Sequence, residues 1–138
     1  MEREVFPAVV ASGSLYALGS DALWTDMGTP RNYLEANLAW ARREGHGHSG
    51  GRATVADSAR VSSSVLHDGV VVESGATVEG SVLLNGARVG KGAVVRRSVL
   101  GASVDVRDNA RVDDLSVLGD GFVVERGEVL VGARLPEP

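Results

Sequence analysis

The side chains of this chain that could do chemistry are few: three histidines, one lysine and a set of carboxylates. His46 and His48 lie in a Gly-His-Gly-His stretch and could ligate a metal ion. A glycine-rich linker in a chain without cysteine favours the simpler interpretation that both are solvated. Lys91 stands in Gly-Ala-Arg-Val-Gly-Lys-Gly, which looks like a phosphate-binding loop, but its glycines keep the register of a longer repeat. We therefore expect these glycines to form corners of a fold rather than a phosphate cradle.

The repeat has a period of 17 residues and runs through the second half of the chain. Its clearest mark is a segment of seven residues that begins and ends on an aliphatic residue. A fixed period of this length is typical of a solenoid, in which each unit packs on the next. The last segment follows after 18 residues, which indicates a one-residue insertion near Leu115. The segments are residues 55–61, 72–78, 89–95, 106–112 and 124–130.

Each unit offers three short apolar patches separated by turn residues. Alternation in two of them, such as Ala76 with Val78 and Ala87 with Val89, predicts strands whose small inward side chains line a narrow core. The third patch reads Ser-Val-Leu, and alternation leaves open which of its residues points inward. One corner position is always glycine or asparagine, as a turn with an unusual backbone angle requires. The corner residues are Gly75, Gly92, Asn109 and Gly127.

This pattern holds one register over about residues 53 to 132 and resembles the hexapeptide-repeat family. The resemblance implies a mainly β protein, a left-handed parallel β-helix of about five coils. Coils spaced at about 4.8 Å give a stack roughly 24 Å tall, and each buried valine contributes on the order of 1.5–3 kcal/mol. The left hand comes from the resemblance alone, because general rules for crossover connections favour the right hand.

Residues 1–45 lack the repeat, and we expect them to form a short α/β unit of strand, loop and helix. Thr29 is placed to cap a helix over 30–43, and Pro30 suits its first turn. Apolar residues from Tyr33 to Ala41 recur at helical spacing and predict one buried face. The glycines of residues 46–52 predict a linker into the β-helix, which we expect to span 53–138 and to end in a C-terminal cap.

The first 45 residues resemble the end of the catalytic domain of a bacterial sugar-nucleotide pyrophosphorylase. Mannose-1-phosphate guanylyltransferases and glucose-1-phosphate nucleotidyltransferases have four such stretches in this order, followed by the same kind of β-helix. Together the two resemblances cover nearly the whole chain. The stretches are Glu-Arg-Glu-Val-Phe-Pro at 2–7, Gly-Ser-Leu-Tyr at 13–16, Trp-Thr-Asp-Met-Gly-Thr-Pro at 24–30 and Tyr-Leu-Glu-Ala-Asn at 33–37.

In that family a nucleoside triphosphate condenses with a sugar 1-phosphate, and pyrophosphate leaves. The resemblance assigns to Asp26 a carboxylate that helps hold a catalytic Mg²⁺, which offsets charge on the attacking and leaving oxygens. A second interpretation makes Asp26 a loop residue that holds a turn through its own backbone. Trp24 is a candidate for lining a sugar pocket, although packing of the loop against the following helix is the interpretation we favour.

The family's Gly-rich nucleotide loop, its second metal-binding Asp and its sugar-phosphate Lys do not occur among these residues. We therefore expect the C-terminal region of such an enzyme, serving assembly or regulation and inactive alone. A free-standing β-helix scaffold that docks on a separate catalytic chain is the alternative. A weaker third option is a hexapeptide acyltransferase with His67 as general base. No repeat spacing leaves room for the extruded loop that closes the acyl-CoA site in such enzymes.

Composition sets limits on localisation and partners. The formal net charge is −4 with both signs interspersed, which argues against a nucleic-acid surface. No apolar run approaches the roughly 20 residues of a membrane span, and the charged start lacks a secretory segment, so we expect a cytoplasmic protein with no membrane contact. Val5, Phe6, Val9 and Val10 would lie exposed without a catalytic domain beneath them. We therefore expect a homo-oligomer or association with a catalytic nucleotidyltransferase chain.

Overall fold

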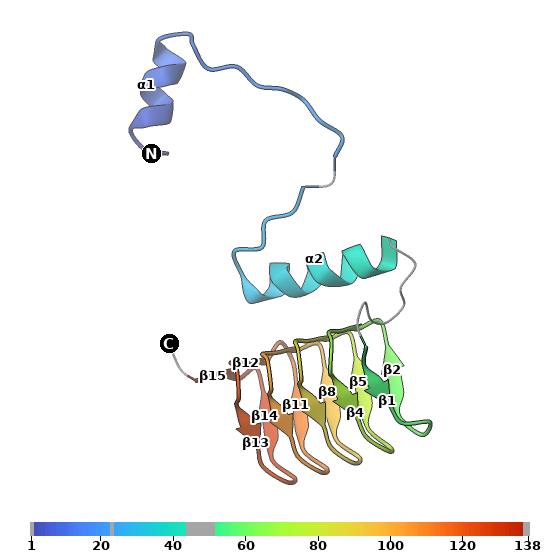
Figure 1. The fold of residues 1–138 in the computed structure, drawn as a ribbon. Coiled ribbons are helices and arrows are strands. Elements are labelled where there is room, and N and C mark those ends of the chain that lie inside the picture. The colour runs from blue at the N-terminus through green and yellow to red at the C-terminus, as the bar shows by residue number, and fades with distance from the viewer. Residues whose placement is uncertain (1, 23, 44–51, 137–138) are drawn as a thin grey trace.

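The chain forms a three-sided stack of β-coils with a helix lying across it, as a computed structural model of residues 2–22, 24–43 and 52–136 shows (Figure 1). These residues contain fifteen short strands and two helices, α1 (Val5–Ala11) and α2 (Pro30–Arg43). Each coil contributes one strand to each of three parallel sheets of five strands. The predicted mainly β architecture of about five coils is confirmed, and the parallel stack matches a left-handed β-helix.

The strands of one sheet are neighbours in space but three elements apart in sequence. The first sheet holds β1 (Thr54–Val55), β4 (Val71–Val72), β7 (Arg88–Val89), β10 (Asp105–Val106) and β13 (Val123–Val124). The second holds β2 (Arg60–Ser62), β5 (Thr77–Glu79), β8 (Val94–Arg96), β11 (Arg111–Asp113) and β14 (Val129–Val131). The third holds β3 (Val65–Leu66), β6 (Val82–Leu83), β9 (Val99–Leu100), β12 (Val117–Leu118) and β15 (Arg134–Leu135).

The pairing register follows the sequence period. Val72 pairs with Val89 across one period, whereas Val106 pairs with Val124 one residue further along. The shift arises after β11, because β11 still pairs with β8 at the regular period but β12 pairs with β9 at the longer one. The inserted residue therefore lies between β11 and β12, next to Leu115, where the sequence predicted it.

The core is a column of small and branched side chains that point to the axis of the stack. Ala76, Val78, Ala87 and Val89 are fully buried, which confirms the alternation predicted for two sides of the coil. On the third side the inward residue is the leucine of each Ser-Val-Leu patch, a point that the sequence left open. Leu66, Leu83, Leu100 and Leu118 are each at most 1% exposed. Because every coil covers the next, stability accumulates along the stack.

The serines of the Ser-Val-Leu patches are also buried, although a hydroxyl without partners in a core costs free energy. Ser81 avoids this cost because its Oγ donates to the carbonyl of Glu79 at 2.8 Å and accepts the N–H of Ser98 at 3.1 Å. Ser64 and Ser116 make the same two kinds of hydrogen bond. The serine column thus links one coil to the next inside the third sheet.

Left-handed backbone turns the chain at the corners of the coil. The predicted corner residues have φ angles between 58° and 71°, which confirms their assignment. At the insertion two consecutive residues take this conformation, Asp114 with φ 53° and Leu115 with φ 63°. Asp113 supports the first of them, because its Oδ1 accepts the N–H of Asp114 at 2.8 Å. The extra residue is therefore absorbed at a corner, and the strands before and after it keep their pairing.

The helix α2 covers the outer face of the sheet that contains β3, β6 and β9 (Figure 1). Its Leu34 is 5% exposed and packs against Val82 and Val99, whose side chains point away from the coil axis. The helix begins as predicted, since Thr29 Oγ1 accepts the N–H of Asn32 at 3.2 Å. The predicted apolar face of the helix thus forms a second, smaller core outside the coils.

The strand expected within residues 1–45 is not formed; residues 5–11 are the helix α1. No strand among the described residues lies beside this segment, so its N–H groups bond locally, as Ser12 N–H does to Ala8 O at 3.1 Å. The expected C-terminal cap is also not seen in the described part of the chain. β13, β14 and β15 form open edges of their sheets, because each is the last strand in its sheet.

Candidate functional site

The loop before α2 carries the two residues to which the family resemblance assigns chemistry, Asp26 and Trp24. Asp26 is exposed, and its Oδ1 accepts the backbone N–H of Gly28 at 2.8 Å. A Cβ at position 28 would lie 3.1 Å from this oxygen, so the tight turn favours glycine there. Asp26 therefore forms the local turn that its second interpretation predicted.

Trp24 does not pack the loop against α2, contrary to the interpretation that we favoured. Its side chain is 82% exposed. Thr25 and Met27 meet the helix instead and line a shallow pocket of about 260 Å³ with Trp40. Trp24 is not among the residues that line this pocket, and Asp26 is exposed.

Asp26 alone does not make a metal site. Mg²⁺ takes a near-octahedral set of oxygen ligands, and Asp26 offers one carboxylate, of which one oxygen already holds the turn. In the part of the chain that the structure describes, no three His, Cys, Asp or Glu side chains gather where they could hold a metal ion. These residues do not fit a Mg²⁺ site by themselves, so no metal-dependent step is assigned to this chain alone.

His67, the histidine that the structure describes, does not form a site either. His67 is half-buried at a corner after β3, and its backbone N–H donates to the carbonyl of Leu83 at 3.0 Å. The coils described here continue past His67 with regular pairing, so no extruded loop reaches it. His46 and His48, with most of the predicted linker 46–52, lie outside the described residues.

Lys91 and its neighbouring glycines belong to a corner, as the repeat register predicted. Gly86 and Gly92 have φ angles of 70° and 66°, and Lys91 N–H donates to Oδ1 of Asp108 at 3.0 Å. Gly90 has another reason to be glycine, because a Cβ there would lie 2.8 Å from the same carboxylate oxygen. The backbone of this loop is therefore committed to the neighbouring coil and is not open to a phosphate.

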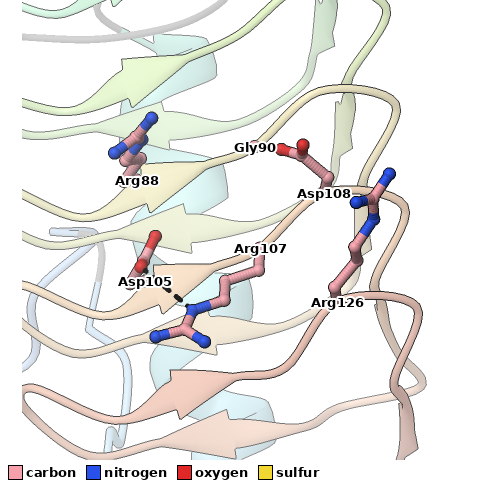
Figure 2. Close-up of a pocket in the computed structure, with 6 residues that line it drawn as sticks. All are labelled: Arg88, Gly90, Asp105, Arg107, Asp108 and Arg126. Carbon is pink, nitrogen blue, oxygen red and sulfur yellow. Dashed lines mark ion pairs between the residues drawn. The ribbon is translucent and has the colours of Figure 1, made fainter.

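A groove of about 350 Å³ lies beside this corner, on the face that carries β7 and β10 (Figure 2). Arg88, Arg107 and Arg126 line it together with Asp105 and Asp108. Two of the arginines are paired: Arg107 lies 2.6 Å from Glu125 and 3.8 Å from Asp105, and Arg88 binds Glu73, which raises the pKa of Arg88. The groove is thus a ladder of exposed ion pairs, whose attraction is screened by water and salt and adds little to stability.

A second pocket, of about 380 Å³, lies between α2 and the corners of the coils. Leu34, Leu38 and the inserted Leu115 form its apolar part. Arg97 and Asp114, which pair with each other, form part of its charged rim. The insertion near Leu115 therefore shapes the seat of the helix, a consequence that the repeat period alone did not reveal.

The most exposed apolar side chains among the described residues lie in two places. One is the segment before α2, residues 2–22 and 24–29, which we call the arm; the other is the last coil. Val5 is 50% exposed, Phe6 is 45% exposed and Val10 is 60% exposed, as predicted, while Val9 is half-buried. Figure 1 shows α1 standing away from the coils. Further along the arm, Leu15, Tyr16, Leu18 and Trp24 are between 49% and 97% exposed. The arm therefore presents apolar side chains that nothing in the described residues covers.

Comparison with known proteins places this arrangement. The model of the family described as GMPPB C-terminal domain matches residues 46–136, which is most of the chain. The chain belongs to this family. The GMPPB C-terminal domain match begins in the linker and covers all five coils, so it rests on the same repeat that sets the fold.

Relatives of this GMPPB C-terminal domain chain are mannose-1-phosphate guanylyltransferases. The mannose-1-phosphate guanylyltransferase of Mycobacterium tuberculosis is 35% identical over 132 residues, which is 94% of this chain and 30% of that protein. The probable mannose-1-phosphate guanylyltransferase 3 of Oryza sativa subsp. japonica is 29% identical over 136 residues, which is 87% of this chain and 38% of that protein. The chain thus spans about a third of the length of the relatives it matches.

Among solved structures, the acetyltransferase domain of PglB from Neisseria gonorrhoeae FA1090, in complex with acetyl coenzyme A, superposes with a TM-score of 0.58. The two are 17% identical, and the match covers 93% of this chain and 82% of that one. At this identity the likeness shows the fold alone. The described residues contain no helix long and apolar enough to cross a membrane.

Sequence reasoning missed two surfaces of this GMPPB C-terminal domain chain. The first is the outer face of the third sheet, where Val82 and Val99 receive α2. The sequence indicated this surface by the valine that recurs in the middle of each Ser-Val-Leu patch. A sheet face that is open to solvent would carry polar residues at this position. The second is the outer face of the last coil, where Val123, Val129 and Val131 are exposed. Its signal was the replacement of charged residues by valine at repeat positions.

Proposed function

We propose that this chain is the assembly part of a nucleotide-sugar pyrophosphorylase of the mannose-1-phosphate guanylyltransferase kind. Such an enzyme joins a nucleoside triphosphate to a sugar 1-phosphate and releases pyrophosphate. The names of the relatives favour GTP and mannose 1-phosphate as the substrates. In this proposal the β-helix serves assembly and regulation, and the reacting groups are bound by a nucleotidyltransferase domain outside these residues.

One observation carries the proposal. The M. tuberculosis relative is similar over 94% of this chain, so the likeness includes the arm and α2 as well as the coils. A scaffold made only of coils does not need the arm, whose apolar side chains are exposed here. Burial of apolar surface is worth roughly 25 cal/mol per Å², so a nucleotidyltransferase domain packed on the arm would stabilise both parts.

Within this proposal Asp26 and Trp24 act only in the assembled enzyme. Asp26 would add one carboxylate to a Mg²⁺ whose other ligands come from the nucleotidyltransferase domain and the triphosphate. Trp24, which is exposed here, would be free to line the sugar pocket of that domain. The ion would offset charge on the attacking and leaving oxygens at the α-phosphorus of the triphosphate. The chain alone is then expected to be inactive.

A free-standing scaffold that docks on a separate catalytic chain is the second candidate. It is favoured by the docking of α2 on the coils, because this gives the described residues a core of their own beyond the repeat. In both proposals the arm is the contact with catalytic protein. They differ in whether the catalytic domain is part of the same polypeptide.

The test combines activity and binding. The purified chain, with GTP, mannose 1-phosphate and Mg²⁺, should form no GDP-mannose. The same chain should bind a mannose-1-phosphate guanylyltransferase catalytic region that lacks its own β-helix, measured by calorimetry. Phe6→Ser with Val10→Ser should weaken this binding at least tenfold, because both side chains are exposed and their replacement leaves the coils intact. Turnover by the chain alone, or unchanged binding by the double variant, would contradict the proposal.

A further inference from the structure

The outer surface of the last coil differs from that of every coil before it. On the second sheet, the positions that match Val129 are Arg60, Thr77, Val94 and Arg111. The positions that match Val131 are Ser62, Glu79, Arg96 and Asp113. Both valines of β14 are 60% exposed. Val94 is also a valine, but every earlier coil has a charged or polar side chain at one or both of these positions, and the last coil has valine at both.

Among the described residues, the outward edge of β14 also lacks a strand to pair with. In the inner coils the outward edge donates to the next coil, as when Arg111 N–H bonds to the carbonyl of Glu128 at 2.7 Å. The matching groups of β14 have no following strand, since β14 is the end of its sheet. An exposed strand edge lined with apolar side chains is a template for pairing with another chain.

The two ends of the stack are not alike. In the first coil the exposed positions that match Val123, Val129 and Val131 are polar: Thr54, Arg60 and Ser62. Continuation of one stack by the first coil of another copy would leave the valines against polar side chains and would generate an open filament. Contact between two last coils matches valine with valine and closes after two copies.

We propose that the last coil is a docking surface for the last coil of a second copy of this chain, related by a two-fold axis. The axis passes by Leu130, so β14 pairs antiparallel with its copy and Val129 lies opposite Val131 of the other chain. The residues whose N–H and C=O groups face the edge, 129 and 131, then exchange hydrogen bonds across the axis. This proposal does not depend on the proposed function.

The same axis explains charges at the rim. It exchanges the first and third sheets, so β13 of one copy faces β15 of the other. Arg134, which is exposed and has no ion pair within the described residues, then approaches the corner that carries Glu125 and Arg126. One acidic and two basic side chains per copy give a rim that is complementary to itself. At the centre, Val129 of each copy and Val131 of the other form two aliphatic cross-strand pairs.

The test is the molar mass in solution, by light scattering and sedimentation velocity over a hundredfold concentration range. The wild-type chain should be a dimer. Val129→Arg with Val131→Arg places like charges opposite each other and should give a monomer, with dissociation favoured at least a hundredfold. Earlier coils carry arginine at both positions, Arg111 where the last coil has Val129 and Arg96 where it has Val131. The variant coil should therefore fold, and its circular dichroism should not change.

Two further variants test the pairing register across the axis and show which terminal coil forms the contact. Val129→Arg with Val131→Asp places opposite charges across the proposed axis and should remain dimeric. Thr54→Arg with Ser62→Arg adds the same charge to the first coil and should also remain dimeric. A monomeric wild-type chain, a dimeric double-arginine variant of β14, or loss of the dimer in the first-coil variant would overturn the proposal. Loss of the dimer in Phe6→Ser with Val10→Ser would likewise assign association to the arm.

Discussion

At the scale of single residues, the buried serines add hydrogen bonds between neighbouring coils, which strands of two or three residues connect with few backbone bonds. Each strand here makes few ladder bonds, and Ser81 adds a side-chain bond to the next coil. Ser81→Ala leaves the Ser98 N–H without its acceptor inside the stack, which costs about 1–3 kcal/mol. Urea unfolding should show this loss as a lower midpoint. Ser74→Ala, at an exposed corner, is the matched control and should change the midpoint little.

A second residue-scale prediction concerns acid. Burial raises the pKa of Asp113, but hydrogen bonds from Arg111 and from the N–H of Asp114 outweigh it and hold the pKa below its ordinary value. The folded state therefore binds a proton at this carboxylate less readily than the unfolded state. Its stabilising contribution is present at neutral pH and is lost as the pH falls below about 4.

Asp113→Asn tests this sign. The variant should be less stable than the wild-type chain at pH 7, because it loses the charged partner of Arg111. The difference in free energy of unfolding should shrink when urea titrations are repeated between pH 5 and pH 3. A difference that stays constant over this range would show that the carboxylate has an ordinary pKa in the folded state.

At the scale of elements, α2 and the coils have separate cores. The coil core excludes Leu34, whose contacts are Val82 and Val99 on the outer face. Leu34→Ala should therefore loosen the helix by about 2–5 kcal/mol while the coils stay folded. Hydrogen exchange measures the two separately: amides of α2 should exchange faster, and those of β5 and β8 should not change. Trp40→Ala, which removes a side chain 59% exposed, should leave the helix protected.

The elements also show how far a sequence of this kind can be interpreted. The period predicted the coils, the corners and the insertion because the same position can be compared in every repeat. Gly75 and Asn109, for example, occupy one corner position, and both have a positive φ. The sequence did not show which residue of the Ser-Val-Leu patch points inward, because valine and leucine are adjacent and both are apolar. Both Val82 and Leu83 are buried, Leu83 in the coil core and Val82 beneath α2. The strand expected within residues 1–45 had no repeat to constrain it; without a neighbouring strand, residues 5–11 form local helix bonds. The packing that we predicted for Trp24 is wrong: Trp24 is exposed, and its neighbours Thr25 and Met27 lie against the helix instead.

At the scale of the whole molecule, the stack has two open ends, because β1, β2 and β3 end the three sheets on one side and β13, β14 and β15 end them on the other. In the first coil, Thr54 N–H bonds to the carbonyl of Val70 at 2.8 Å and Ala56 N–H bonds to that of Val72 at 2.9 Å. In the last coil the matching groups, at Val123 and Glu125, have no following coil, and Glu125 N–H bonds instead to Oε2 of Glu128 at 2.7 Å. A monomer should therefore protect the amides of Thr54 and Ala56 better than that of Val123.

Hydrogen exchange turns this asymmetry into the final prediction. In the monomeric variant Val129→Arg with Val131→Arg, amides of β13 and β14 that face the edge should exchange nearly as fast as those of an unstructured peptide, while Thr54 and Ala56 stay protected. In the wild-type chain the amides of residues 129 and 131 should be protected at least tenfold more than in the variant, and increasingly so with concentration, because pairing across the two-fold axis gives them acceptors. Equal protection of β14 in both chains would mean that the edge is satisfied within one chain, and the open edge of the last coil would then have no consequence for assembly.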